Sequence, residues 1–142
     1  MPESNKAIAL RIWSEVWNAR RLDLIEELYA QDFVADYRPT APLRHGHEGI
    51  RGMVERAWIA FPDFHENLED MIAEGDKVAV RVTITGTHLG PMGALAPTGR
   101  KVSFEEMLIE RFVGGRVVWQ RGIPDNRTLL TQLGILPPVP QS

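Results

Sequence analysis

The sequence has 142 residues, of which 44% are hydrophobic and 25% are charged, and its formal net charge is −3. These values predict one globular domain with a sizeable core, and they exclude wholesale disorder and the basic footprint that nucleic-acid binding requires. The absence of cysteine excludes disulfides, thiol catalysis and thiolate metal sites.

The N-terminal stretch MPESNKAIALRIW lacks the basic start and the apolar run of a signal peptide. No apolar stretch of the chain reaches the length of a membrane span. We therefore expect a soluble, cytoplasmic protein with no membrane partner.

Helical spacing dominates the first part of the chain. Ser4 or Asn5 can cap a first helix, whose apolar residues recur at three- and four-residue spacing. These residues are Ile8, Ile12, Trp13, Val16 and Trp17. A second, short helical segment covers residues 22–30, and a third covers residues 46–61, where Pro62 stops it.

Strands follow these helices. Residues 33–37 predict a brief strand, and from residue 64 onward the pattern has the two-residue period of β-structure. The long predicted strands cover residues 64–72, 77–88, 101–112 and 116–123. Glycine turns join them into hairpins, with one loop over residues 90–99. A last helical segment, residues 127–133, ends at Gly134.

This order of elements indicates an α+β fold, in which a curved antiparallel sheet folds over the helices with a pocket between them. We predict one domain over residues 1–136 and an extended, proline-rich tail over residues 137–142.

Short motifs for metal, phosphate or serine chemistry are absent or incomplete. His45 and His47 lack a third ligand at suitable spacing, so an exposed position is the favoured interpretation. His88 ends a strand before a Gly-Pro loop, where a side chain can line a cavity mouth or make a structural hydrogen bond. The sequence has no phosphate-binding glycine loop and no G-x-S-x-G elbow.

The predicted strand over residues 101–112 carries acidic residues on both faces. On one face, Glu106 and Glu110 alternate with apolar side chains. Because a lone buried carboxylate is costly, each must reach solvent, pair with an arginine such as Arg121, or line a polar cavity. The pattern leaves the arginine pair and the cavity equally open.

Asp125 lies between the last strand and the last helical segment. Asp and Asn are the best helix N-caps, and the residues by themselves favour a cap. Asn126 could cap the helix alone, however, which would leave Asp125 free to act as an acid facing a pocket. The tryptophans are similarly ambiguous, because core packing and a pocket for a planar ligand would use the same residues.

Three stretches resemble the SnoaL-like polyketide cyclase (ester cyclase) family of the nuclear transport factor 2-like superfamily. They are the turn GTHLGP, the strand start PTGRKVSF and the helix LLTQLG, and the order of elements agrees over nearly the whole chain. The resemblance implies a cone-shaped α+β barrel, with a strongly bent antiparallel sheet wrapped around three helices and a deep pocket. It also implies a dimer or a higher assembly.

For function, the resemblance implies an intramolecular aldol condensation on an aromatic polyketide ester, without a metal or organic cofactor. The key residue of the family is an aspartate ahead of the Leu-Leu-rich helix, and Asp125 matches that position. It would remove a proton α to a carbonyl and return one to the aldol oxygen. Family members frequently carry a histidine where this chain has Met107-Leu108, so Glu106 or Glu110 could replace it.

The resulting hypothesis is a cofactor-independent cyclase for a hydrophobic carbonyl compound, assembled as a homodimer or higher homo-oligomer. Asp125 is the expected acid and base, assisted by Glu106, Glu110 or Arg121. The predicted substrate-binding residues are Trp17, Tyr37, Trp58, His88, Trp119 and Arg121, and no metal site is predicted. Two alternatives stay open: a non-catalytic ligand-binding or dimerisation module, and a hydrolase that holds a water between Asp125, Glu106 and Arg121.

Overall fold

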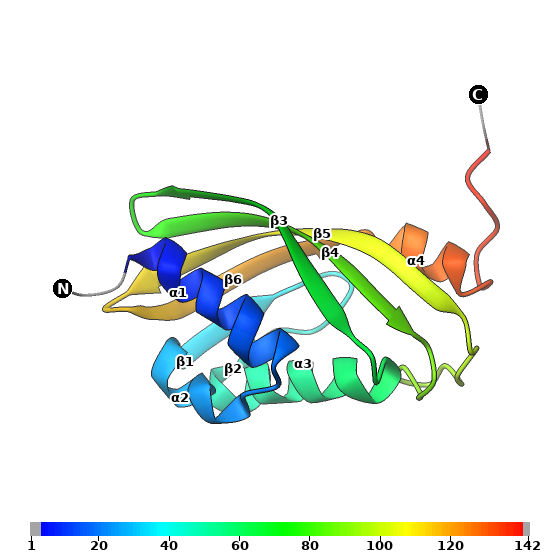
Figure 1. The fold of residues 1–142 in the computed structure, drawn as a ribbon, viewed down its shortest axis with the longest axis horizontal. Helices are drawn as coiled ribbons and strands as arrows, with labels where there is room; N and C mark the ends of the chain where they lie inside the picture. The colour runs from blue at the N-terminus through cyan, green and yellow to red at the C-terminus, as the bar shows by residue number, and fades with distance from the viewer. Residues whose placement is uncertain (1–3, 141–142) are drawn as a thin grey trace.

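The computed structural model describes residues 4–140, in which six strands form one curved sheet (Figure 1). The strands are β1 (Tyr29–Asp36), β2 (Arg44–His45), β3 (His65–Glu74), β4 (Lys77–Thr87), β5 (Lys101–Val113) and β6 (Arg116–Pro124). Their order in the sheet is β2-β1-β6-β5-β4-β3. Neighbours run antiparallel except β1 and β6, which run parallel. The sheet does not close, because β2 and β3 form its two edges.

Most of the helical segments line one side of this sheet. They are α1 (Asn5–Arg11), the π-helical segment η1 (Ile12–Asn18) that continues it, the 3-10 turn η2 (Leu22–Leu24), α2 (Ile25–Leu28), α3 (Gly46–Ala60) and α4 (Asn126–Gln132). The α1–η1 segment packs against β3 and β4, whereas α3 packs against β1. Figure 1 shows α1 and α3 on the hollow side of the bent sheet and α4 at its far end, beside β5.

Strand alternation creates the core on the hollow side. Val78, Val80, Val82 and Ile84 of β4 point inward and are at most 4% exposed, as the two-residue pattern predicts. They belong to one apolar cluster with the buried face of α1 and η1. Burying a side chain of this size stabilises the fold by about 1.5–3 kcal/mol.

The predicted α+β fold, with its helices ahead of the long strands, is confirmed. The first strand differs in length: it begins at Tyr29, so the helical segment before it ends at Leu28 rather than at residue 30. The buried rings of Tyr29 and Phe33 meet edge-to-face, with centroids 4.9 Å apart, and the pairing of β1 with β6 shifts register between Tyr29 and Val34. The parallel pairing of β1 with β6 joins segments far apart in the chain, so no local sequence pattern predicts it.

The expectations about the chain ends are only partly covered by the structure. Residues 137–140 of the predicted tail form neither helix nor strand, and residues 141–142 lie outside the described residues. No helix within residues 4–140 has the length and apolar character needed to cross a membrane. The domain limit at residue 136 and the cytoplasmic location stay predictions.

Candidate active site

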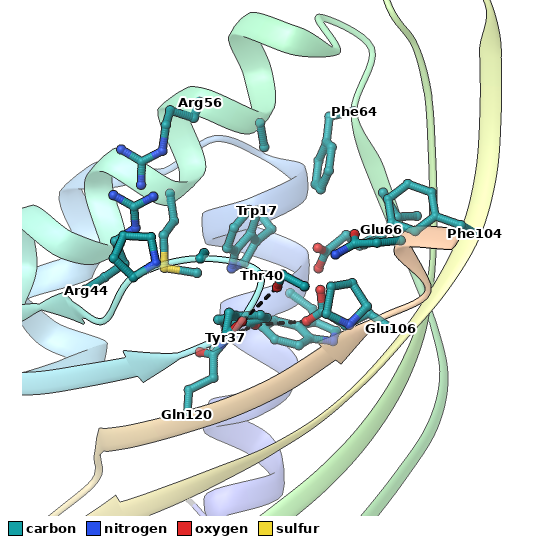
Figure 2. A pocket seen from close by; sticks show the side chains of 18 residues that line it. Trp17, Tyr37, Thr40, Arg44, Arg56, Phe64, Glu66, Phe104, Glu106 and Gln120 are labelled. Atoms are coloured by element: carbon teal, nitrogen blue, oxygen red, sulfur yellow. Dashed lines mark hydrogen bonds between the residues drawn. The ribbon is translucent and has the colours of Figure 1, made fainter. Parts of the chain in front are cut away.

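A cavity of about 310 Å³ lies between the inner face of the sheet, η1, α3 and the segment that follows β1 (Figure 2). Its volume is at the small end of the range of roughly 300–1,000 Å³ that is usual for ligand pockets. Aromatic side chains form much of its wall, from Trp13, Trp17, Phe64 and Phe104. Trp17 and Phe64 lie in contact, with ring centroids 5.8 Å apart. These walls suit a flat, apolar ligand.

Glu106 is the acidic group of β5 that reaches this cavity. The inward parity of β5 places it between Val82 of β4 and Pro124 of β6. The hydroxyl of Tyr37 donates a hydrogen bond to its Oε2 at 2.9 Å. Burial raises the pKa of Glu106 to about 7, against the opposing effect of the Tyr37 hydrogen bond. At neutral pH this carboxyl therefore exists in both its charged and its neutral form.

Tyr37 is held in place from two sides. The Nε2 amide of the buried Gln120 donates a hydrogen bond to the Tyr37 hydroxyl at 2.5 Å, so a chain runs from Gln120 through Tyr37 to Glu106. The ring of Tyr37 lies across Gly122 of β6, where a Cβ atom would come within 2.2 Å of it. Only glycine gives the ring this room.

Glu66 brings a second carboxyl to the same cavity from β3. Asn18, at the end of η1, fixes its backbone with two hydrogen bonds of 2.8 Å, one to the Glu66 carbonyl and one from the Glu66 N–H. The side chain is buried, and its Oε2 has no hydrogen-bond partner among the described residues. Burial, together with the charges of Glu106 and Glu110, raises the pKa of Glu66 well above its usual value. Burial therefore favours the neutral form of Glu66, which can donate a proton.

Glu110 lies deeper than the other two acids. It is fully buried opposite Gln120, does not line the cavity, and neither of its oxygens has a hydrogen-bond partner among the described residues. Burial, and secondarily the charge of Glu106, raises its pKa to about 8. The sequence left an arginine pair and a cavity equally open for these glutamates. Among residues 4–140, none of the ion pairs involves Glu66, Glu106 or Glu110, so the three acids are held without a cation.

The structure does not bring Asp125 to the cavity. Its carboxylate is exposed and caps α4, accepting hydrogen bonds from the Thr128 N–H at 3.1 Å and the Thr128 hydroxyl at 2.6 Å. These two donors lower the pKa of Asp125 below its usual value. Asp125 was expected to face the pocket, but it caps α4 instead. Pro124 is the last inward-facing residue of β6, and the chain leaves the sheet after it. Asn126, the spare cap of the sequence, lines the cavity instead.

Two predicted binding residues of β6 also lie elsewhere. Trp119 and Arg121 alternate with the inward-facing Gln120 and Gly122, so they point to the outer face. Arg121 bonds to Asp36, with 3.3 Å between Nη1 and Oδ1, and not to a glutamate of β5.

His88 and Trp58 have structural surroundings outside the cavity lining. The Nδ1 of the fully buried His88 accepts a hydrogen bond from the Thr98 N–H at 3.1 Å, which ties the loop over residues 90–99 to β4. Trp58 is covered by Arg20, whose guanidinium carbon lies 4.9 Å from the ring centroid. Of the predicted binding residues, the structure places Trp17 and Tyr37 at the cavity.

Several groups of the site were missed by the sequence-based prediction. Glu66 shares the parity of Phe64 on β3, and an acid on an apolar face was a readable signal. Arg44, Arg56 and Gln120 gave no such signal, because each depends on a neighbour from another element. Within residues 4–140, no group of three or more His, Asp or Glu side chains is arranged to hold a metal ion.

Comparisons with known proteins agree with this architecture. The model of the SnoaL-like polyketide cyclase family matches residues 7–133. The chain is 33% identical over 113 residues to the aklanonic acid methyl ester cyclase AcmA of Streptomyces galilaeus, covering 72% of this chain and 78% of that protein. It is 30% identical over 123 residues to the nogalonic acid methyl ester cyclase of Streptomyces nogalater, covering 83% and 89%.

Two crystal structures give the same result at the level of the fold. AclR, a proposed hydroxylase of Streptomyces galilaeus, superposes with a TM-score of 0.82 at 33% identity over 96% of this chain and 84% of its own. IdmH, a proposed polyketide cyclase of Streptomyces antibioticus, has a TM-score of 0.82 at 30% identity, over 93% and 99%.

Proposed function

This chain belongs to the SnoaL-like polyketide cyclase family, and from this premise we propose that it closes a ring in a hydrophobic, polyketide-like carbonyl compound by aldol chemistry. One observation carries the proposal: Glu106 lies in an aromatic cavity with a pKa of about 7 and no cationic partner among residues 4–140. A general base works best when its pKa is near the working pH.

The reaction begins at Glu106. Its ionised form takes a proton from a carbon α to a carbonyl, and the resulting enolate carbon forms a bond to a second carbonyl carbon of the same molecule. The electron pair of that second carbonyl moves to its oxygen. One carbon–carbon bond forms and one proton moves from carbon to oxygen, so the step needs no oxidant, reductant or cofactor.

Glu66 is the proposed acid for the new hydroxyl. Burial favours its neutral form and its Oε2 is unpartnered in the described structure, so it can donate a proton to the developing alkoxide. Because Glu106 has gained a proton in the first step, exchange between the two acids through the cavity restores both. Two acids with differently shifted pKa values are the usual means of running both proton transfers at one pH.

Tyr37 supports the base rather than replacing it. Burial and the charge of Glu106 raise the pKa of Tyr37 well above its usual value, so the hydroxyl stays protonated and keeps donating to Glu106. This donor fixes the orientation of the carboxylate and lowers its pKa toward neutrality.

The alternatives from the sequence make different demands. The hydrolase hypothesis requires Asp125, Glu106 and Arg121 around one water, but Arg121 points to the outer face and Asp125 caps α4. A non-catalytic binding module does not need an acid that titrates near pH 7 in its cavity.

The homo-oligomer stays a prediction. Apolar side chains are exposed on the outer face of the sheet, where Met107 and Ile123 lie opposite one another.

The test is a matched pair of glutamine variants, assayed with aklanonic and nogalonic acid methyl esters, the compounds in the names of the two relatives. Glu106→Gln should lower turnover by about 100- to 10,000-fold, and it should equally slow deuterium exchange at the α carbon. The control is Glu105→Gln, because Glu105 is exposed on the other face of β5 and pairs with Arg81 at 3.3 Å. Unchanged turnover and exchange in Glu106→Gln would show that Glu106 is not the base.

Asp125→Asn, assayed beside this pair, separates the family-based assignment from the structural one. Full turnover in Asp125→Asn together with loss in Glu106→Gln supports the proposal. Loss in Asp125→Asn alone would return the catalytic role to Asp125.

A further inference from the structure

Two arginines line the cavity on the side away from its acids. Figure 2 shows the guanidinium groups of Arg44, from β2, and Arg56, from α3, close together, with Glu66 and Glu106 across the cavity. The side chain of neither arginine has a hydrogen bond or an ion pair with any other residue between 4 and 140. By contrast, Arg51, also on α3, is paired with Glu48.

The arginines oppose one another electrostatically. Burial, and next the charge of Arg44, lowers the pKa of Arg56, while the neighbouring Glu55 opposes this effect. Arg56 is exposed and Arg44 is half-buried, so water screens part of their repulsion, and an anion between them would relieve the rest. A ligand that supplies a negative charge therefore stabilises the two arginines at this wall.

Glycines of α3 make the room for both arginines. A Cβ atom on Gly52 would lie 3.0 Å from Nη1 of Arg56, and one on Gly49 would lie 3.0 Å from the backbone carbon of Arg44 and 3.2 Å from its Cβ. A glycine inside a helix costs about 1 kcal/mol relative to alanine. Gly49 thus lets the backbone of Arg44 approach α3, and Gly52 leaves space for the guanidinium of Arg56 beside the helix.

We propose that Arg44 and Arg56 form an anion-binding subsite for a carboxylate carried by the apolar ligand of this cavity. A planar guanidinium matches a carboxylate by two parallel hydrogen bonds. The aromatic walls next to the arginines, from Trp17 and Phe64, take the hydrocarbon part of the same molecule. A phosphate ester would bring a second charge and a larger hydration shell into an apolar cavity, so the carboxylate is the better fit.

The subsite deepens the proposed function and rests on it only for the identity of the ligand as substrate. A carboxylate held at the arginines places the other end of the molecule across the cavity, toward Glu106 and Tyr37. The ligand class is then a flat, hydrophobic carbonyl compound with a free acid group. The two curated relatives are named for methyl esters, and a methyl ester carries no charge.

Titration calorimetry with anthraquinone-2-carboxylate and with its methyl ester tests the subsite. The wild-type protein should bind the acid about tenfold more tightly than the ester, as expected for charge-assisted hydrogen bonds. Raising the salt to about 0.5 M should weaken binding of the acid and leave binding of the ester nearly unchanged. Inorganic phosphate should not displace the acid at equal concentration; displacement would indicate a general phosphate site and would overturn the carboxylate assignment.

Variants locate the effect. Arg44→Met with Arg56→Met should abolish the preference for the acid, Arg44→Lys with Arg56→Lys should keep part of it, and Arg51→Met should leave it unchanged. Circular dichroism and thermal unfolding establish that each variant is folded. Equal affinity of the wild type for acid and ester, no binding of the acid at about millimolar concentration, or an unchanged preference in the methionine variant would overturn the proposal.

The outcome is independent of the catalytic proposal. Glu106→Gln should keep the preference for the acid, because its side chain lies across the cavity from the arginines. If the protein prefers the acid but turns over no substrate, the anion-binding subsite is supported and the cyclase mechanism is rejected. If it turns over substrate but does not prefer the acid, the cyclase mechanism is supported and the subsite is rejected.

Discussion

The inner face of β5 and the joint between β6 and α4 each hold a carboxyl group, and their surroundings give the two groups opposite properties. Glu106 is enclosed beside aromatic side chains, has one donor, and has a pKa of about 7. Asp125 is exposed, accepts two hydrogen bonds from Thr128, and has a lowered pKa. Desolvation dominates at the first position and hydrogen bonding at the second.

The difference shows how the surroundings of two carboxyl groups in one domain shift their pKa values in opposite directions. A carboxylate that ends a strand and starts a helix is stabilised in its charged form by the helix N–H groups. A carboxylate on the inward face of a strand cannot obtain these donors, so its neutral form becomes accessible near pH 7. The second kind is the better match for proton exchange with a substrate at neutral pH.

The largest expected effect comes from disturbing the support of Glu106. Gly122→Ala places a Cβ atom within 2.2 Å of the Tyr37 ring, so Tyr37 must move and release Glu106. We expect turnover to fall by about 100-fold, as is usual when a catalytic group is displaced by about 1 Å. Steady-state kinetics together with thermal unfolding measure this.

A double variant provides the control for that change. Adding Tyr37→Ala to Gly122→Ala removes the clash, so the thermal stability should recover in part while turnover stays low. Normal turnover in Gly122→Ala would mean that the position of Tyr37 does not matter to the base.

The next effect concerns the pH dependence of stability. The pKa of Glu110 is about 8 in the folded protein, above its value in the unfolded chain. Its contribution to the free energy of unfolding is therefore complete at low pH and is lost as the pH rises toward 8. The wild-type free energy of unfolding should fall by about 1.4 kcal/mol per pH unit through this group, or by about 2 kcal/mol between about pH 6 and pH 7.5. Glu110→Gln should abolish this part of the fall. Urea unfolding at several pH values measures the slope.

Asp125→Asn is the matched control for that slope. The pKa of Asp125 is lowered, so its contribution is present at neutral pH and disappears only as the solution becomes acidic. The variant should therefore lose stability evenly across the same pH range. An equal change of slope in both variants would contradict the contrast between the two regions.

A smaller effect is expected from Tyr37→Phe. Loss of the hydroxyl removes the hydrogen bond that lowers the pKa of Glu106, so the rise of activity with pH should move from about 7 to a higher value. A shift of up to about one pH unit is typical for one hydrogen bond. The pH profile of kcat/KM measures it, and an unchanged profile would assign the titration to another group.

The smallest effect is the cap itself. Asp125→Ala removes the acceptor of the Thr128 N–H and should cost about 1 kcal/mol of unfolding free energy. Ligand affinity should stay intact, because Asp125 does not line the cavity. Chemical unfolding and calorimetry measure the two quantities, and loss of affinity without loss of stability would place Asp125 in the site after all.

Much of the architecture follows from local patterns. The alternation of Val78, Val80 and Val82 predicts the strand β4. The four-residue spacing of Ile12 and Val16 predicts the buried face of the first helical segment. The Ser4 cap and the end of α4 before Gly134 are likewise readable, because caps depend on neighbours within a few residues. Glu106 and Glu110 stand on an otherwise apolar strand face, and the pattern left an arginine pair and a cavity equally open; the structure places Glu106 at the cavity and Glu110 deeper.

The sequence by itself determined the α+β class, the strand faces and the candidates Glu106, Tyr37 and Trp17, because these depend on periodicity and side-chain chemistry. Tertiary structure alone decided that β1 lies parallel to β6, that Glu66 joins Glu106, and that Arg44 meets Arg56. It also decided that Asp125 faces solvent. The physical reason is the same in each case: burial and charge proximity depend on contacts between elements far apart in the chain, and these contacts set both the pKa of a group and the space beside it.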